Sequence, residues 1–286
     1  MFLNPEARAL LRKLRRNRLA MVGVALVGFV VLFSLLLPPL LPFDPNQMNV
    51  RNALQSPDAI HWLGTDHFGR DLLTRLAHGG GISLQVGFYV TLLSLVVGVG
   101  FGALSGFVGG AIDVVMMRAM DALMAFPGLL LAIALVAAFG GTVEAIVIAL
   151  TIVGVPRFAR VVRASVIQRK EADYVLAATA LGKRPMRILM QDVLPNCAGP
   201  ILIQTTLKFP GAILGEAGLS FLGLGLPPPA PSWGRMLQES RSFMEVAPAA
   251  AILSGLAIFV TVLGFNLLGD GLRDVFDPRV QSSGQS

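Results

Sequence analysis

Long apolar stretches, each about the length needed to cross a lipid bilayer, constrain this chain more than any other feature. Stretches 19–43 and 84–112 contain no charged residue. A helix rises about 1.5 Å per residue, so roughly 20 apolar residues span the hydrocarbon core of a bilayer. Four further apolar stretches follow: 122–143, 144–163, 197–222 and 246–269. Because lipid offers no partner to exposed backbone groups, we expect an all-α membrane protein with about six transmembrane helices.

The overall composition supports a membrane protein and excludes other classes. Hydrophobic residues make up 54% of the 286 residues and charged residues only 14%, whereas about a quarter of a soluble domain is charged. The formal net charge of +6 could indicate nucleic acid, but the basic residues are not gathered on a soluble face. Cys197 is the only cysteine, which excludes an intramolecular disulfide and a cysteine-cluster metal site.

The basic residues predict the orientation of the chain. One set of segments, comprising the N-terminal tail, Arg118, the region 157–187 and the C-terminal tail, holds 17 of the 23 Lys and Arg residues, and the two opposite loops hold five. Since cytoplasmic segments are enriched in Lys and Arg, both termini and the loop 171–196 should be cytoplasmic. The basic N-terminus resembles a signal peptide, but the apolar run after it is too long and lacks a cleavage site. We expect an N-terminal unit, 1–83, with a tail, an uncleaved first span and an extracytoplasmic loop, and a transmembrane core, 84–286.

The polar loop 171–196 has the pattern of two short helices joined by a turn. Small and apolar side chains recur at helical spacing and would form one narrow face: Tyr174, Ala177, Ala178 and Leu181. Gly182 follows as a helix stop. Pro185 can open a second helix in which Met186, Met190 and Leu194 share a face, and Leu194 and Pro195 would end it. This loop predicts a surface that meets a soluble partner, although an ordinary amphipathic loop is the alternative.

The loop resembles the cytoplasmic coupling loop, or EAA loop, of permease subunits in ABC importers. The family pattern has two alanines, a glycine after three more residues, and a later Leu-Pro, matched here by Ala177, Ala178, Gly182, Leu194 and Pro195. Leu176 replaces the glutamate that gives the loop its name, and Asp192 replaces a basic residue or histidine. Three other stretches match in order: LGTDHFGRD, EAGLSFLGLGLPPPAPSWG and FNLLGDGLRDVFDP. Together they resemble the C-type permease subunit of dipeptide, oligopeptide or nickel importers.

The resemblance implies a type I ABC importer fold and a non-catalytic subunit of a prokaryotic inner-membrane importer for di- or oligopeptides. The implied partners are a homologous B-type permease subunit, two cytoplasmic ATPases and an extracytoplasmic binding protein. ATP and Mg would be bound by the ATPases, since no GxxxxGK[ST] motif occurs in this chain and no cofactor is expected in it. Residues expected to couple to the ATPases are Tyr174, Ala177, Ala178, Leu181, Gly182, Arg187, Leu194 and Pro195. A nickel-chelate or glutathione importer of the same family is an alternative.

Two charged residues in the stretch 197–222 are candidates for the translocation path. Lys208 and Glu216 lie among apolar residues, and a charge at mid-membrane costs at least about 2.5 to 3.5 kcal/mol unless it faces protein or water. They could instead be the ionisable pair of an ion-coupled secondary transporter. A membrane scaffold without a transport path is a third possibility.

Other polar and small residues predict structural roles. His61, His67 and His78 lie near Asp66 and Asp71, but their spacing matches no compact ligand motif, so we expect no metal site. Four glycines repeat every fourth residue and should allow a neighbouring helix to approach closely: Gly98, Gly102, Gly106 and Gly110. Pro127 should kink the span 122–143. Arg118 should pair with Asp113 or Asp121, and Arg157, Arg160 and Arg163 should stack along one side at the cytoplasmic end of their span.

Overall fold

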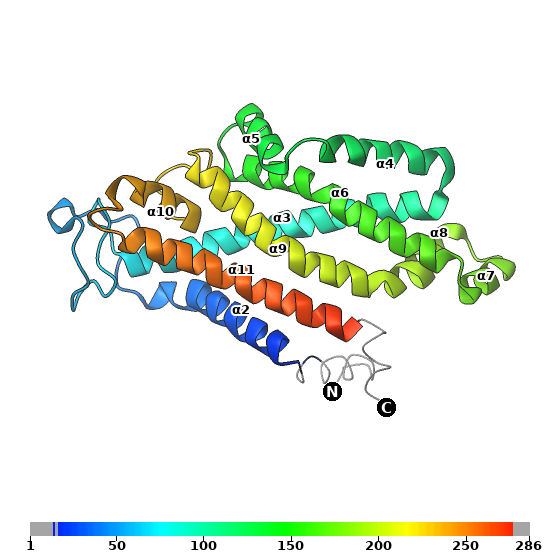
Figure 1. Ribbon diagram of the computed structural model, residues 1–286, viewed down its shortest axis with the longest axis horizontal. Helices are drawn as coiled ribbons and strands as arrows, with labels where there is room; N and C mark the ends of the chain where they lie inside the picture. The colour runs from blue at the N-terminus through cyan, green and yellow to red at the C-terminus, as the bar shows by residue number, and fades with distance from the viewer. Residues whose placement is uncertain (1–13, 15–16, 277–286) are drawn as a thin grey trace.

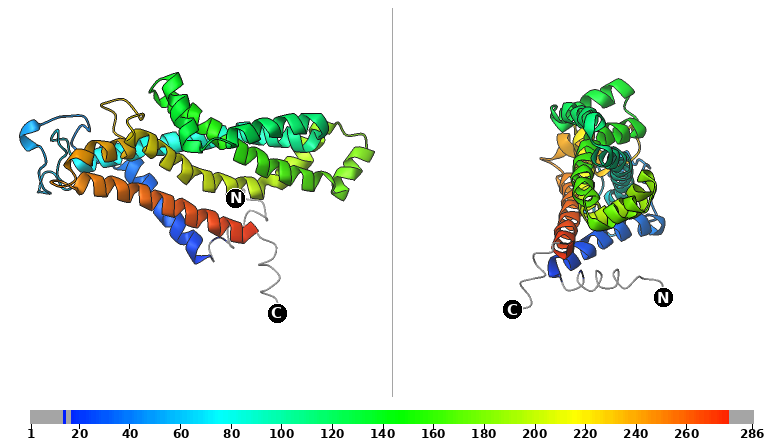
Figure 2. Two further views of the ribbon diagram at one scale, coloured as in Figure 1. Left: turned by 45° about the horizontal axis from the view of Figure 1, so that its top comes forward. Right: turned by 90° about the vertical axis from the view of Figure 1, so that its right-hand side faces the viewer.

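The computed structural model describes residue 14 and residues 17–276, and it is an elongated helical bundle (Figure 1). Five long helices run along it: α2 (Arg18–Leu36), α3 (Leu72–Val108), α6 (Val143–Lys170), α9 (Ala198–Phe221) and α11 (Ala249–Phe276). Most of the basic N-terminal tail and the last residues of the expected C-terminal tail lie outside the described residues. Figures 1 and 2 place α4 (Gly110–Met124) and α5 (Gly128–Phe139) on the opposite side of the bundle from α2 and α11.

The two ends of the bundle carry different short elements. One end, which we call the tip, consists of residues 171–197 and contains α7 (Asp173–Ala180) and α8 (Pro185–Ile188). The other, which we call the loop end, consists of residues 37–71 and 222–248. It contains α10 (Trp233–Ser240) and three single-turn helices, Pro38–Leu40, Val50–Asn52 and Arg241–Phe243.

The number of spans is smaller than the sequence predicted. Within residues 17–276, α2, α3, α6 and α11 are long and apolar enough to cross a membrane, and the α4–α5 pair would make a fifth span. The shortfall from six concerns α9, which packs against α3, α6 and α11 but is interrupted by polar residues. The described part of the chain is therefore an all-helical protein with four or five candidate spans.

The predicted helix 122–143 is not one kinked helix. Helix α4 ends at Met124 and α5 begins at Gly128, with a bend of 90° between them. Pro127 lies at the bend in an extended conformation, with φ of −55° and ψ of 123°. Proline has no N–H to continue the helix and disfavours helical backbone at the residue before it, so the helix breaks here instead of bending.

Close packing of α3 on α6 forms the centre of the bundle. As predicted, Gly98, Gly102 and Gly106 face the neighbouring helix, and a Cβ at Gly106 would lie 2.8 Å from the carbonyl oxygen of Arg163. Gly110 does not belong to this face. Helix α3 ends at Val108, and Gly110 begins α4 with a φ of +59°, so the four-residue glycine repeat continues beyond the end of α3.

Candidate functional site

The tip has the predicted arrangement of helix, turn and helix. Gly182 follows α7 with a φ of +75°, in the left-handed region. The Gly182 N–H donates to the carbonyl of Thr179 at 2.9 Å, and the Lys183 N–H donates to the carbonyl of Ala178 at 3.1 Å. These two bonds are those of the Schellman motif, which ends helices at a left-handed residue. Gly182 thus ends the helix because its backbone adopts the left-handed conformation that the Schellman motif requires.

The second half of the tip differs from the prediction. Pro185 is the first residue of α8, as expected, but Leu194 and Pro195 do not end the helical path. The chain continues as a π-helical turn, Leu189–Val193, and a 3₁₀ turn, Leu194–Cys197, directly into α9. Since Pro195 cannot donate a backbone hydrogen bond, the regular bonding pattern changes register there while the chain stays helical.

An ion pair that the motif comparison did not predict closes the tip. The Lys183 ammonium lies 2.6 Å from the Asp192 carboxylate, which links the turn to the second helix. Both side chains are partly exposed, so the pair stabilises the fold by less than about 1 kcal/mol. Asp192, a departure from the family pattern, therefore has a local partner.

The inner face of the tip joins the core of the bundle. Its buried residues pack with buried residues of α3 and α6 in one cluster: Ala103, Val162, Val166, Val175, Ile188, Leu189, Val193 and Cys197. Ala178 and Leu194 are partly buried against this cluster. Two residues of the expected docking faces therefore support the tip from inside.

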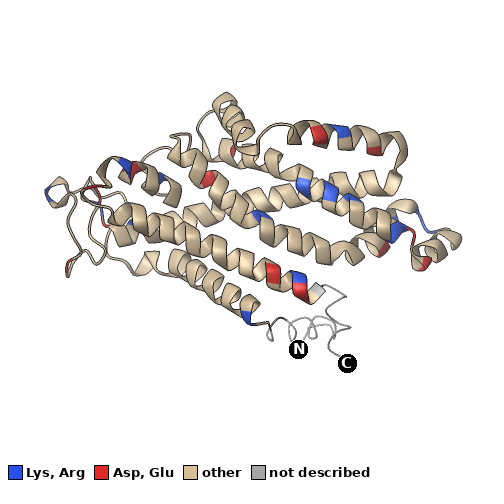
Figure 3. Ribbon diagram, in the orientation of Figure 1, with Lys and Arg blue, Asp and Glu red and all other residues tan. Residues whose placement is uncertain are grey.

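The outer face of the tip is an exposed surface with many apolar side chains. Of the expected coupling residues, Tyr174, Ala177, Leu181, Gly182, Arg187 and Pro195 are exposed. Leu181 exposes 87% of its surface, and Leu176, Met186 and Met190 of the tip are also exposed. These side chains lie outside the candidate membrane spans, and exposed apolar surface of this kind typically marks an interaction site. Figure 3 shows basic residues on the tip and along the half of α6 nearest to it.

Lys208 and Glu216 lie in different surroundings. The Lys208 side chain is partly buried against α6, where Nζ donates to the carbonyl of Leu150 at 3.4 Å. Glu216 is 0% exposed. Hydroxyl groups of Ser83, Ser220 and Ser232 donate to its carboxylate at 3.2, 2.8 and 2.9 Å. Glu216 therefore links α3, α9 and the start of α10 within the subunit, and its expected place on the translocation path stays a prediction.

Buried ion pairs hold the loop end together, and the sequence did not predict them. Arg70 pairs with Asp66 at 2.6 Å and with Glu239 of α10 at 2.7 Å. Arg75 lies 3.4 Å from Asp66 and 3.2 Å from Glu239. Breaking a buried pair leaves an uncompensated charge, at a cost of about 3 to 5 kcal/mol. The LGTDHFGRD motif therefore ties the loop after α2 to α10.

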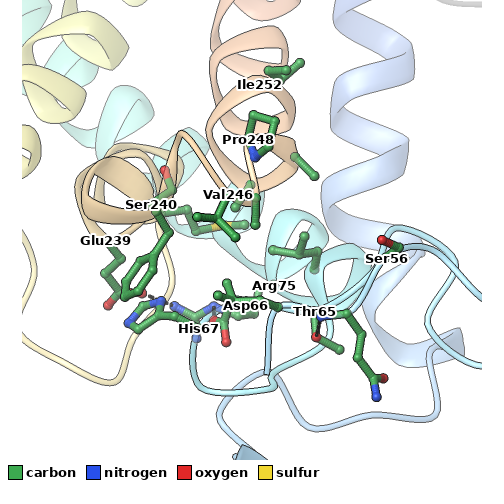
Figure 4. Close-up of a pocket in the computed structure, with 18 of the residues that line it drawn as sticks. Ser56, Thr65, Asp66, His67, Arg75, Glu239, Ser240, Val246, Pro248 and Ile252 are labelled. Atoms are coloured by element: carbon green, nitrogen blue, oxygen red, sulfur yellow. Dashed lines mark hydrogen bonds and ion pairs between the residues drawn. The ribbon is translucent and has the colours of Figure 1, made fainter. Parts of the chain in front are cut away.

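A cavity of about 310 Å³ adjoins these ion pairs. Figure 4 shows Asp66, His67 and Arg75 on one side of it and Glu239 and Ser240 on another, with Val246 and Pro248 just before α11 and Ile252 in its first turn. The His67 ring stacks on Phe243 with centroids 4.8 Å apart, and burial lowers the pKa of His67. The cavity thus joins the loop after α2 to α10 and α11.

The other two histidines have structural contacts. His61 Nδ1 lies 3.0 Å from Asp71, and His78 Nδ1 lies 2.9 Å from the carbonyl of Thr74. Asp71 also accepts from the Thr74 N–H at 2.8 Å and so caps α3. Within the described part of the chain, no three His, Cys, Asp or Glu residues could hold a metal ion.

The expected pairing of Arg118 is wrong. Arg163 forms a two-bond pair with Asp113, with both distances 2.6 Å, and Arg160 pairs with Asp121 at 2.6 Å. These bonds attach α4 to α6, since the two arginines of α6 reach across to the acids of α4. The spacing of acids around Arg118 suggested a local pair, but the neighbouring helix supplies the partners.

Comparison with known proteins agrees with this architecture. The family model described as binding-protein-dependent transport system inner membrane component matches residues 98–282. The model described as N-terminal TM domain of oligopeptide transport permease C matches residues 7–57. A chain of the MetNI methionine ABC transporter, solved in inward-facing conformations, superimposes with a TM-score of 0.58 over 71% of this chain and 97% of that chain. Its sequence identity of 17% supports the fold alone.

Several curated proteins are similar over nearly their whole length. The dipeptide transport system permease protein DppC of Alkalihalophilus pseudofirmus is 44% identical, covering 95% of this chain and 89% of that protein. The oligopeptide transport system permease protein OppC of Bacillus subtilis is 41% identical, covering 94% and 88%. The glutathione transport system permease protein GsiD of Pectobacterium atrosepticum is 40% identical, covering 95% and 90%. The chain therefore belongs to the family of binding-protein-dependent transport system inner membrane components, as its motifs indicated.

Proposed function

We propose that this chain is a permease subunit of an ATP-driven importer for di- or oligopeptides. The observation that carries the proposal is the tip: an exposed, largely apolar outer face on an inner face that is packed into α3 and α6. The relatives named for dipeptide and oligopeptide transport support the substrate class. The relative named for glutathione transport favours a glutathione importer as the second candidate.

The proposed partners match the two ends of the bundle. Cytoplasmic ATPases would bind the outer face of the tip, and a binding protein would deliver peptide at the loop end. A homologous permease subunit would complete the path. ATP and Mg would be bound by the ATPases, and no covalent chemistry is assigned to this chain.

The proposed topology has six crossings. Helix α9 and the bent α4–α5 pair would cross the membrane beside the four candidate spans, with both termini and the tip in the cytoplasm. The polar residues that lower the hydropathy of α9 lie against α6 or inside the subunit, so lipid need not solvate them. Membrane lipid would cover the exposed apolar sides of α2 and α11.

The proposed mechanism is alternating access driven by the tip. Closure of the ATPases would move the tip, and the buried cluster shared by α3, α6 and the tip would transmit that movement to the spans. The Schellman turn at Gly182 would keep the two short helices in one orientation.

A pair of matched variants on α7 tests this function. Ala177 is exposed and lies about 60° around the helix from Tyr174. Ala177→Asp puts a charge on the outer face and should release the ATPases from the purified complex, whereas the uncharged variant Ala177→Ser should retain them. In proteoliposomes, ATP-dependent uptake of tri-alanine should be lost only in the first variant. Wild-type uptake by Ala177→Asp at equal expression would contradict the proposal.

A further inference from the structure

We infer that Arg157 and Lys208 bind the carboxylate of the peptide as it passes along the translocation path. The inference rests on the proposed function and adds to it a substrate chemistry and a second residue of the path. It begins from the position of the two cations: Arg157 lies near the middle of α6, and Lys208 lies near the middle of α9. Neither is at a helix end, where a cation could reach lipid headgroups.

Neither cation has a carboxylate partner within residues 17–276. The neighbouring arginines of α6 are paired, Arg160 with Asp121 and Arg163 with Asp113. No ion pair of the described residues includes Arg157 or Lys208. Of the three arginines Arg157, Arg160 and Arg163, Arg157 is therefore the one without a carboxylate partner among residues 17–276.

Arg157 lies on the face of α6 that Lys208 of α9 contacts. Leu150, Gly154 and Arg157 follow one another at helical spacing, so they lie on one side of the helix. Lys208 Nζ donates to the Leu150 carbonyl at 3.4 Å, and a Cβ at Gly154 would lie 2.7 Å from Nζ. Gly154 thus leaves the space that the ammonium group occupies.

A hydroxyl group lies at the same place. The missing Cβ of Gly154 would contact Ser94 Oγ of α3 as well as Lys208. Ser94 Oγ donates to the Thr151 carbonyl at 3.3 Å. Three helices therefore contribute polar groups to this face: a hydroxyl from α3, a guanidinium from α6 and an ammonium from α9.

The electrostatics select an anion. Each charge at mid-membrane depth costs at least about 2.5 to 3.5 kcal/mol unless it faces water or protein, and two neighbouring cations raise that cost further. A water-filled path relieves it, and an anion relieves it more. A peptide with a free C-terminus carries one carboxylate, whose two oxygens accept charge-assisted hydrogen bonds from a guanidinium and an ammonium. The same two charges repel a free metal cation.

The test uses the whole importer in proteoliposomes, with its binding protein and ATPases. Uptake of tri-alanine and ATP hydrolysis are measured for Lys208→Gln and Arg157→Gln, for the charge-keeping variants Lys208→Arg and Arg157→Lys, and for the control Arg160→Gln. Loss of one charge-assisted hydrogen bond should reduce the peptide transported per ATP by about tenfold or more in the two neutral variants. The charge-keeping variants should retain most transport. The control should match the wild type, since Asp121 already neutralises Arg160.

Three outcomes would overturn the inference. Wild-type transport per ATP in both neutral variants would show that the charges do not meet the substrate. Separation of the permease subunits on gel filtration of these variants would show that the cations pair with acids of the second subunit instead. Absence of ATP-dependent uptake by the wild-type complex would overturn the proposed function and this inference with it, whereas the first two results leave the proposed function standing.

Discussion

Replacing Gly182 by valine should reduce transport and binding-protein-stimulated ATP hydrolysis together, without unfolding the bundle. A Cβ at Gly182 would meet no atom within 4 Å, so the cost of the change is conformational and not steric crowding. The φ of +75° costs a residue with a Cβ roughly 1 to 2 kcal/mol, and a β-branched one more. That penalty reduces the fraction of tips in the native orientation by about 5- to 30-fold relative to competing loop conformations.

The assay compares Gly182→Val with Gly182→Asn, because asparagine adopts the left-handed region more readily than other residues with a Cβ. Binding-protein-stimulated ATP hydrolysis and tri-alanine uptake should fall together in the valine variant and much less in the asparagine variant. Both proteins should reach the membrane in normal amounts, since the buried cluster beneath the tip is unchanged. Equal transport by the valine variant and the wild type would refute the argument that this turn orients the tip.

Further predictions concern topology, pH and the buried carboxylate. In a Cys197→Ser background, an impermeant thiol reagent added to intact cells should label a cysteine at exposed Ser56 and should not label one at exposed Leu181; the reverse would invert the topology. Burial lowers the pKa of His67, so its contribution to stability is present above the ordinary value of 6.5 and is lost as the pH falls below it. The melting temperature of the purified permease pair should therefore fall between pH 7.5 and 5.5, and less so for His67→Phe, which keeps the stacking. Glu216→Ala should lower the melting temperature by leaving three serine hydroxyls without their acceptor, at about 1 to 3 kcal/mol each at most, whereas Glu216→Gln should recover part of the loss.

The features that the sequence predicted well depend on neighbouring residues. The first helix of the tip, its glycine stop and the start of the second helix follow from spacing, from Gly182 and from Pro185. The packing of α3 against α6 also follows from a local repeat, since glycines four residues apart face one neighbour. In both cases a short stretch contains the whole signal.

The features that it missed depend on residues far apart in the chain. The expected span began at residue 84, but α3 begins at Leu72 because Asp71 caps it and Arg75 is paired with Glu239, 164 residues away. A lone acid in an apolar stretch, such as Glu216, shows that burying its charge is costly, but it does not show which groups bind it. Two of the three serines that donate to Glu216 come from other segments. The cavity at the loop end could not be predicted for the same reason.

The tip is joined to its two flanking helices in mechanically different ways. On one side α6 stays α-helical up to its end at Lys170, and only Glu171 and Ala172 separate it from α7. On the other side, a π turn and a 3₁₀ turn at Pro195 separate α8 from α9, so regular hydrogen bonding is interrupted for about two turns. A movement of the tip should therefore be transmitted to α6 more directly than to α9. Helix α9, which carries Lys208, and helix α6, which its ammonium group contacts, can accordingly be displaced by unequal amounts when the tip moves.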